Sequence, residues 1–492
     1  MHLKQIIEIC GTKFFIYLII IQLFIKGLLY GMIESLILPI SQLIGLDGIK
    51  YQITSTIAEI PWSSAKPIFG ILSDNLSIFG YKKKYYIVLT NIIGSLFALL
   101  LAIFLKSGNP IFICFCFFAI QLQISVVDLL TEAKYAEIMK NNPDSGSNIV
   151  SFVNALNSIG SLISVLIIGF LADLDSYFIY SILLYVCFGI SLMPLIPTLL
   201  GWLSEIKLNS EINSEIIEIN ELIMPKTSTK WKNIFVFTTG CIGAIVSVVL
   251  VFNTLAGTII TSICLTLSLL LSYKFFDKII VKACIYRCCT YLLYWGFSGA
   301  MDYYMTANND CVPNGPHFSY MYYITWTGIV GAIVSFLGTI VYQVLFGKSK
   351  IRNVLIVTTI ISSLFSCFDL IIVKRWNLTI HIPDKWFYML GDQICYNLID
   401  MLNYIPLMTL ISKNVEDNAE STTYGYISGI SNLARILSYL IGSYAMQWFQ
   451  ISTIIPCNFQ YLWLLILVGH IAIPLLLIPL SFWLIPNISV VE

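Results

Sequence analysis

Long runs of apolar residues recur along the whole chain of 492 residues. Each run has roughly 20 residues, enough for a helix to cross the ~30 Å hydrocarbon core of a bilayer. Only 11% of the residues are charged, against about one quarter in an ordinary soluble domain. The strands of a membrane β-barrel alternate apolar and polar residues, which runs such as 99–105 do not. The sequence therefore predicts an all-α polytopic membrane protein.

Turn residues and charges divide these runs into six spans, then two, then six, which gives about 14 apolar spans with 12 in the core. The predicted spans are 14–40, 51–72, 85–106, 110–131, 149–172, 177–202, 233–252, 256–273, 283–304, 320–345, 353–373, 387–411, 424–446 and 461–485. The predicted domains are an N-terminal six-helix half (1–203), a polar cytoplasmic linker (204–232), an extra transmembrane hairpin (233–278) and a C-terminal six-helix half (279–492).

The loops between these spans carry an uneven distribution of the 27 Lys and Arg residues. With a cytoplasmic N-terminus, four of them lie within spans and most of the others lie in inside loops, as the positive-inside rule requires. The exterior loops then hold five: Lys50, Lys106, Lys374, Arg375 and Lys385. Both termini are therefore expected in the cytoplasm.

Composition also excludes several kinds of function. The net charge is zero and no basic tract exceeds 82–84, which argues against nucleic-acid binding. The thirteen cysteines show no metal-site spacing and the four histidines are not clustered, so we expect no enzyme activity, metal or cofactor. Cys311 and Cys457 both lie in predicted exterior loops, where a disulfide between them is one option.

The two predicted halves share residues at an offset of about 270 positions. Asp128 in the fourth span corresponds to Asp400, and Asn157 in the fifth span corresponds to Asn432. Parallel repeats of two six-helix halves are the architecture of major facilitator transporters. The repeat favours a fold of that type.

Ionisable residues inside the spans are the most informative positions, because a charge in hydrocarbon needs a partner, a water-filled cavity or a function. Three spans of the first half each carry a polar stripe on one helix face. These stripes are Lys26 and Glu34 in the first span, Glu59, Trp62 and Lys66 in the second, and Asp128, Glu132 and Tyr135 in the fourth. The second half contributes Asp302, Asp369, Asp392, Asp400 and Arg435.

Two interpretations of these residues remain open. The charges either pair with one another and hold the helices together, or they line a path for a solute. Arg435 is the candidate in the second half for holding a carboxylate, since a guanidinium group binds a carboxylate in a bidentate manner.

The segment 70–84, with the sequence GILSDNLSIFGYKKK, resembles the loop motif between the second and third spans of major facilitator transporters. In such a gating motif Gly70 permits close helix approach, Asp74 caps or pairs at the membrane edge, and Lys82, Lys83 and Lys84 contact the inner leaflet. Extra residues before Gly80 lengthen the motif here.

A narrower resemblance covers most of the chain in the same order. The segments that carry it are Pro61-Trp62, Lys66-Pro67, Gly70 with Ser73-Asp74, Asp128-Leu129-Leu130, Lys134-Tyr135-Ala136-Glu137, Tyr303-Tyr304, Pro406-Leu407, Glu420-Ser421-Thr422 and Ser431-Asn432-Leu433-Ala434. In these segments the chain resembles the folate-biopterin transporter family, a branch of the major facilitator superfamily. Its composition, rich in Ile, Asn and Lys, resembles that of the protozoan-type members.

This resemblance implies a proton-coupled transporter of folates or pterins, and we expect the protein to be a monomer. A flat pterin ring can stack on Trp62 or Tyr135, and a carboxylate needs a cation. The expected substrate-binding residues are Lys26, Glu59, Trp62, Lys66, Asp128, Tyr135 and Arg435. Loss of hydration favours the protonated carboxyl group, which makes Glu59, Asp128 and Glu132 the expected carriers of the proton.

Two alternatives to this function remain. The first is a transporter of another organic anion or an amino-acid derivative, because a family constrains the fold better than the substrate. The second is a membrane sensor or scaffold that does not transport. The plasma membrane is the default location, and an organelle membrane would leave the same pattern of spans.

Overall fold

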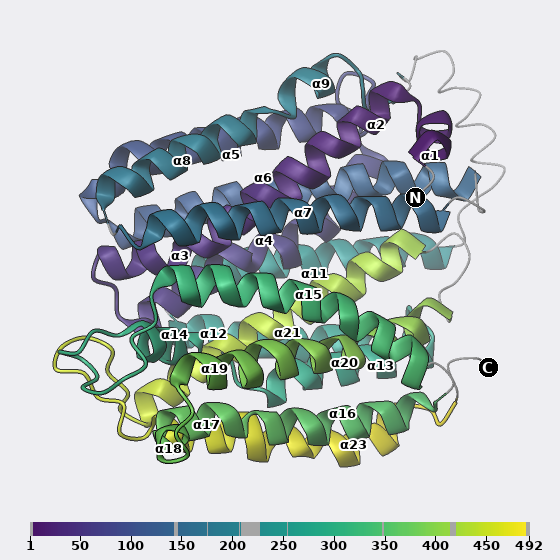
Figure 1. The fold of residues 1–492 in the computed structure, drawn as a ribbon. Helices are drawn as coiled ribbons and strands as arrows, with labels where there is room; N and C mark the ends of the chain where they lie inside the picture. Colours follow the sequence, from purple (N-terminus) through teal and green to yellow (C-terminus); the bar gives the residue numbers. More distant parts are fainter. Residues whose placement is uncertain are drawn as a thin grey trace.

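The structure is a computed structural model whose regular elements are helices. It describes residues 3–141, 146–174, 176–205, 207, 227–252, 254–346, 349–413 and 420–488. Figure 1 shows the long helices side by side in one bundle, with the N-terminal helices (purple to blue) above the C-terminal ones (green to yellow) and both termini at the same end. We call residues 3–203 the first half and residues 278–488 the second half. Most of the predicted linker lies outside the described residues.

In the first half, each predicted span coincides with a helix or a series of helices, and the series in the sixth span, 177–202, is interrupted between Leu192 and Leu195. The first span joins two α-helices through a π-helix, a form that often occurs at functional sites. The elements are α1 (Leu3–Cys10), α2 (Thr12–Ile19), η1 (Ile20–Leu29, the π-helix), α3 (Tyr30–Leu43), α4 (Gly48–Asn75), α5 (Lys84–Phe104), η2 (Leu105–Ser107), α6 (Pro110–Asn141), α7 (Gly146–Ala172), α8 (Tyr177–Leu192) and α9 (Leu195–Leu199).

The remaining elements are the hairpin helices and the second half, which has more short helical segments. The hairpin is α11 (Thr227–Phe252) and α12 (Thr254–Ser272). The second half is α13 (Lys278–Leu293), α14 (Ser298–Thr306), η4 (Met321–Trp326), α15 (Thr327–Val341), η5 (Tyr342–Phe346), α16 (Ile351–Phe365), α17 (Cys367–Val373), α18 (Trp376–Thr379), α19 (Asp384–Tyr388), η6 (Met389–Tyr396), α20 (Asn397–Lys413), α21 (Glu420–Trp448), α22 (Leu462–Ile466), η7 (Leu467–Ala472), η8 (Ile473–Leu476) and α23 (Leu477–Leu484).

Among the described residues, eight helical segments are long and apolar enough to cross a membrane. They are Thr12–Leu43, Lys84–Ser107, Pro110–Tyr135, Phe152–Ala172, Tyr177–Leu199, Leu255–Ser272, Ile351–Val373 and Leu462–Leu484. This confirms the prediction of an all-α polytopic membrane protein. The long helix α4 is not among them because it carries Glu59, Lys66 and other polar residues.

Each half has its own hydrophobic core. One cluster of buried apolar residues is drawn almost entirely from residues 6–203, and a second is drawn from residues 235–485. A smaller apolar cluster joins Ile57 and Ile60 of α4 to Ile436 and Leu440 of α21 where the halves meet. Charged side chains of the same two helices also lie at this boundary.

The hairpin packs beside α4 and α21, the helices that adjoin across the two halves. A Cβ atom on Gly240 of α11 would lie 3.0 Å from the Ser64 carbonyl oxygen of α4. The Tyr426 hydroxyl group of α21 donates a hydrogen bond of 3.0 Å to the Ser268 carbonyl oxygen of α12. The extra helices thus cover one side of the boundary between the halves.

The predicted span 283–304 is not continuous. Helix α13 ends at Leu293 and α14 begins at Ser298. In the gap, the carbonyl oxygen of Gly296 accepts a hydrogen bond of 2.8 Å from Gln52 Nε2, and the N–H of Gly299 donates one of 3.0 Å to Gln52 Oε1. The break is possible because a side chain from the other half replaces helical hydrogen bonds that the backbone gives up.

A disulfide joins Cys311 and Cys457, whose Cα atoms are 5.2 Å apart. Both residues lie in loops at the end of the bundle opposite the two termini. We call this the disulfide end, and the end that holds the termini the linker end.

Candidate functional site

Three charged side chains from three helices meet between η1, α4 and α6. One carboxylate oxygen of Asp128 lies 2.8 Å from Lys26 Nζ, and the other lies 3.1 Å from Lys66 Nζ. The Asp128 side chain is only 1% exposed. The polar stripes predicted on these three helices therefore face one another. The triad of Lys26, Lys66 and Asp128 carries a net charge of one positive.

A second ion pair connects the two halves. Arg435 Nη2 of α21 lies 2.8 Å from Glu59 Oε2 of α4. The buried Nε–H group of Arg435 has no hydrogen-bond partner in the part of the chain that the structure describes. The guanidinium group therefore keeps donor capacity for a further partner.

Aromatic side chains lie beside these charges. The indole N–H of Trp62 donates a hydrogen bond of 3.1 Å to Gln121 Oε1, which fixes the ring orientation. Lys66 Nζ lies 4.9 Å from the Trp62 ring centroid, within cation–π range. Tyr30 meets Trp62 edge to face with 5.4 Å between the ring centroids, and its hydroxyl group donates a 2.5 Å hydrogen bond to Glu34.

These side chains surround a cavity of about 260 Å³ between the halves, which we call the central cavity. Three predicted site residues line it: Lys26, Trp62 and Arg435. Lys66, Asp128 and Glu59 are ion-paired or in ring contact with those three. Two predicted residues of α6 lie apart from its lining: Tyr135, which is buried, and Glu132, which is exposed.

Sequence reasoning did not place four lining residues in the site: Tyr30, Asn157, Ser161 and Asn432. Tyr30 follows Lys26 by four positions and so shares its helix face, a signal that was present in the sequence. Asn157 and Asn432 were matched as a repeat pair, but nothing in the repeat alone indicates that both face a cavity.

The gating motif is hydrogen-bonded to Glu205, which follows the sixth span. The Glu205 carboxylate accepts hydrogen bonds from the backbone N–H groups of Lys82 (2.6 Å), Lys83 (2.9 Å) and Lys84 (3.0 Å). A carboxylate is favourable at this position because it faces the N-terminus of α5. The close helix approach expected at Gly70 is not present, since a Cβ atom there would lie 3.8 Å from its nearest neighbour. The Asp74 side chain is outside the described part.

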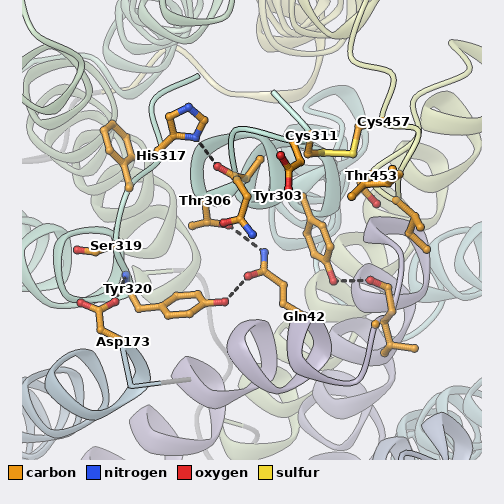
Figure 2. Close-up of a pocket in the computed structure, with 18 residues that line it drawn as sticks. Gln42, Asp173, Tyr303, Thr306, Cys311, His317, Ser319, Tyr320, Thr453 and Cys457 are labelled. Atoms are coloured by element: carbon orange, nitrogen blue, oxygen red, sulfur yellow. Dashed lines mark hydrogen bonds between the residues drawn. A yellow bond between two sulfur atoms is a disulfide. The ribbon is translucent and has the colours of Figure 1, made fainter. Parts of the chain in front are cut away.

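A larger cavity of about 610 Å³ lies at the disulfide end. Figure 2 shows Gln42 of the first half between Thr306 and Tyr320 of the second half, hydrogen-bonded to both. The Asp173 carboxylate accepts hydrogen bonds from the backbone N–H groups of Tyr320 (2.6 Å) and Met321 (3.2 Å). These contacts hold the two halves together at this end.

The charges that line this outer cavity do not suit an anionic ligand. Asp173 and Asp310 contribute carboxylates, while the described lining includes no Lys or Arg and only His317 as a basic side chain. The central cavity is therefore the better candidate site although it is smaller.

Comparison with known proteins gives a consistent result. The BT1 family model matches residues 29–492. The chain is 23% identical to "Probable folate-biopterin transporter 2" of Arabidopsis thaliana, with 89% of this chain and 75% of the relative covered. It is also 23% identical to "Folate transporter 1" of Plasmodium falciparum, with 90% and 74% covered.

Among solved structures, a POT family transporter in complex with a thioalcohol-conjugated peptide superposes with a TM-score of 0.66. The two chains are 13% identical, and 96% of each is covered. This likeness shows the fold, which is that of the major facilitator transporters, as predicted. Because the family model covers far more than half of the sequence, the chain belongs to the BT1 family, which confirms its predicted resemblance to the folate-biopterin transporters.

Proposed function

We propose that this protein carries folate or pterin compounds across a membrane by alternating access, with protons as the coupling ion. The observation that carries this proposal is the central cavity, in which cationic and aromatic side chains from both halves face one space. The names of the relatives agree with the proposed substrates.

The charges of the site support an anionic or zwitterionic substrate. Lys26 and Lys66 share the single carboxylate of Asp128, and Arg435 is balanced by Glu59. The net charge of these five groups is one positive, and Glu34, which accepts a hydrogen bond from Tyr30, is a further acidic group near the cavity. The buried Nε–H group of Arg435 is the donor available to a substrate carboxylate. Trp62 and Tyr30 offer aromatic surface for a flat ring in the same cavity.

We also propose that the chain divides into the halves 1–203 and 279–492, the linker 204–232 and the hairpin 233–278. The protein is proposed to be a monomer with both termini in the cytoplasm. The disulfide between Cys311 and Cys457 supports this orientation, since disulfides persist in oxidising compartments and this one lies opposite the termini. The plasma membrane is the location we propose by default.

Uptake by the purified protein in liposomes tests the substrate. We expect saturable uptake of labelled folic acid, 5-methyltetrahydrofolate and biopterin, enhanced by an inward proton gradient. If none of the three enters from protein shown to be folded, the substrate is another organic anion or an amino-acid derivative, and the folate proposal fails.

Proton coupling is proposed to act through Glu59 first, with Asp128 and Glu132 as the other candidate carboxylates. Protonation of Glu59 would remove the partner of Arg435 and release the guanidinium group to bind the substrate carboxylate. Proton binding and substrate binding would then favour each other, which is the requirement for symport. Asp128 is less suited because two ammonium groups occupy both of its oxygens.

The Glu59→Gln variant tests this mechanism. Its amide is a permanent mimic of the protonated acid, so we expect the ratio of uptake with and without a proton gradient to fall to about one, while exchange of labelled for unlabelled substrate continues. The matched control is Glu137→Gln, which alters an exposed glutamate on α6. A Glu59→Gln protein with the wild-type gradient ratio would assign coupling to another carboxylate.

A further inference from the structure

The lining of the central cavity includes neutral polar groups from both halves whose hydrogen-bonding capacity the described residues leave unused. The Asn157 carboxamide and the Ser161 hydroxyl group on α7 donate and accept no side-chain hydrogen bond within the described residues. Asn432 Nδ2 donates one long bond of 3.4 Å to the Trp62 carbonyl oxygen, which leaves its own Oδ1 available. Groups of this kind gain most from a ligand that brings complementary donors and acceptors.

Close backbone packing against η1 fixes the position of α7, the helix that carries Asn157 and Ser161. A Cβ atom on Gly27 would lie 2.7 Å from the Asn157 carbonyl oxygen and 2.8 Å from the Gly160 Cα atom. A Cβ atom on Gly160 would lie 2.2 Å from the Leu23 carbonyl oxygen. Helix α7 therefore touches η1 directly, which places Asn157 and Ser161 beside the segment that carries Lys26.

The two asparagines come from opposite halves at matching positions of the repeat. Asn157 belongs to the predicted span 149–172 and Asn432 to the predicted span 424–446, and both line the same cavity. They therefore offer two carboxamides to a single ligand from two sides, next to the aromatic surface of Trp62 and Tyr30.

A carboxamide pairs best with a planar edge on which a donor and an acceptor stand side by side. The pterin ring has such an edge, formed by its carbonyl oxygen, ring N–H and exocyclic amino group. The volume of about 260 Å³ lies just below the roughly 300 Å³ lower end of common ligand pockets, so it suits a ring rather than a complete folate.

We propose that Asn157 and Asn432, assisted by Ser161, bind the amide edge of the pterin ring, while the lysines and Arg435 bind the carboxylate tail of a folate. This assignment rests on the proposed function. One set of residues binds the ring and the other binds the tail. A substitution in one set should therefore weaken the binding of ligands that contain the matching part and spare those that lack it.

Binding to the purified protein can be measured with three probes: biopterin, which has the ring without the tail, p-aminobenzoylglutamate, which has the tail without the ring, and folic acid, which has both. Asn157→Ala and Asn432→Ala are each expected to weaken biopterin and folic acid by about tenfold, the effect of one lost hydrogen bond, and to leave p-aminobenzoylglutamate unchanged. Lys66→Met should weaken folic acid and p-aminobenzoylglutamate and spare biopterin.

The matched control is Asn154→Ala, the same change at an exposed position of α7. Asn157→Ser, which keeps a small polar side chain, serves as a second variant if the alanine protein is unstable, and the same selective loss is expected. Equal weakening of all three probes, or of none, would overturn the assignment. If the wild-type protein binds none of the three, the proposed function itself fails.

Discussion

Asp128→Asn is expected to lower the kcat/KM of uptake by at least about 100-fold and to destabilise the folded protein. The asparagine side chain has one acceptor oxygen where Asp128 offers two, and its amino group faces an ammonium group. Lys26 and Lys66 would then share a neutral partner at a site that is only 1% exposed. Removing one member of a buried ion pair lowers the free energy of unfolding by about 3–5 kcal/mol.

Uptake in liposomes and the midpoint of thermal unfolding measure the two effects. Asp310→Asn is the matched control, because it makes the same change at an exposed aspartate and should alter neither quantity. The double variant Lys66→Met with Asp128→Asn removes one cation together with the anion, so we expect it to regain stability without regaining transport. A double variant no more stable than Asp128→Asn would show that the charge balance of the triad is not what stabilises the site.

The fold could be predicted from the apolar runs because lipid permits so few spanning structures. All 14 predicted spans fall on helices or series of helices. Helix α4 is the informative case. Its polar residues exclude it from the helices apolar enough to cross a membrane by composition, yet it is long and packs within the bundle. Those same residues, Glu59, Trp62 and Lys66, belong to the candidate site.

The pairing within the site could not be predicted. The sequence indicates which helix face carries Asp128, but whether its partner is Lys26, Lys66 or Arg435 depends on how three helices pack. The position of η1 also depends on its close contact with α7 at Gly27 and Gly160, and nothing in the local sequence identifies these two residues as neighbours.

The break in the predicted span 283–304 could not be predicted for a similar reason. Residues 283–304 read as one apolar run, and a glycine at position 296 is compatible with a continuous helix. The break depends on Gln52, which is distant in sequence and belongs to the other half. Long-range hydrogen bonds of this kind have no signature in hydropathy.

Gln52 gives the second large prediction, which concerns the closure of the disulfide end. Its side chain is 1% exposed and lies among three segments of the second half. Gln52 Nε2 approaches the carbonyl oxygens of Gly296 (2.8 Å) and Tyr439 (2.5 Å) and the hydroxyl group of Ser443 (2.9 Å). Leucine at this position would remove the partner of the Gly296 carbonyl oxygen and of the Gly299 N–H. The Tyr439 carbonyl oxygen would keep its hydrogen bond from the Ser443 hydroxyl group.

Each buried polar group left without a partner costs about 1–3 kcal/mol. Gln52→Leu should therefore weaken the closed arrangement by about 3 kcal/mol or more, which is a shift of roughly 100-fold or more between the closed and open states of the disulfide end. Because alternating access requires both states to be reached, transport should fall as the open state accumulates.

The distance between two labels at the disulfide end measures this shift. Labels can be attached through non-natural amino acids at Asn109 in the first half and Trp386 in the second, both exposed, which avoids the free cysteines of the chain. The distance distribution of Gln52→Leu is expected to move to longer values. Gln460→Leu is the matched control, since it makes the same change at an exposed glutamine of the same end.

A Gln52→Leu protein with the wild-type distance distribution would mean that other contacts suffice to close the disulfide end. Other hydrogen bonds between the halves at this end include those of Tyr51 with Asp302 (2.7 Å) and of Tyr303 with the Leu46 carbonyl oxygen (2.7 Å). Those of Gln42 and Asp173 lie beside the open space of the outer cavity. Water can replace a lost partner at those two positions, whereas it cannot reach the buried amide of Gln52. The energy of closure should therefore depend on Gln52 more than on either of them.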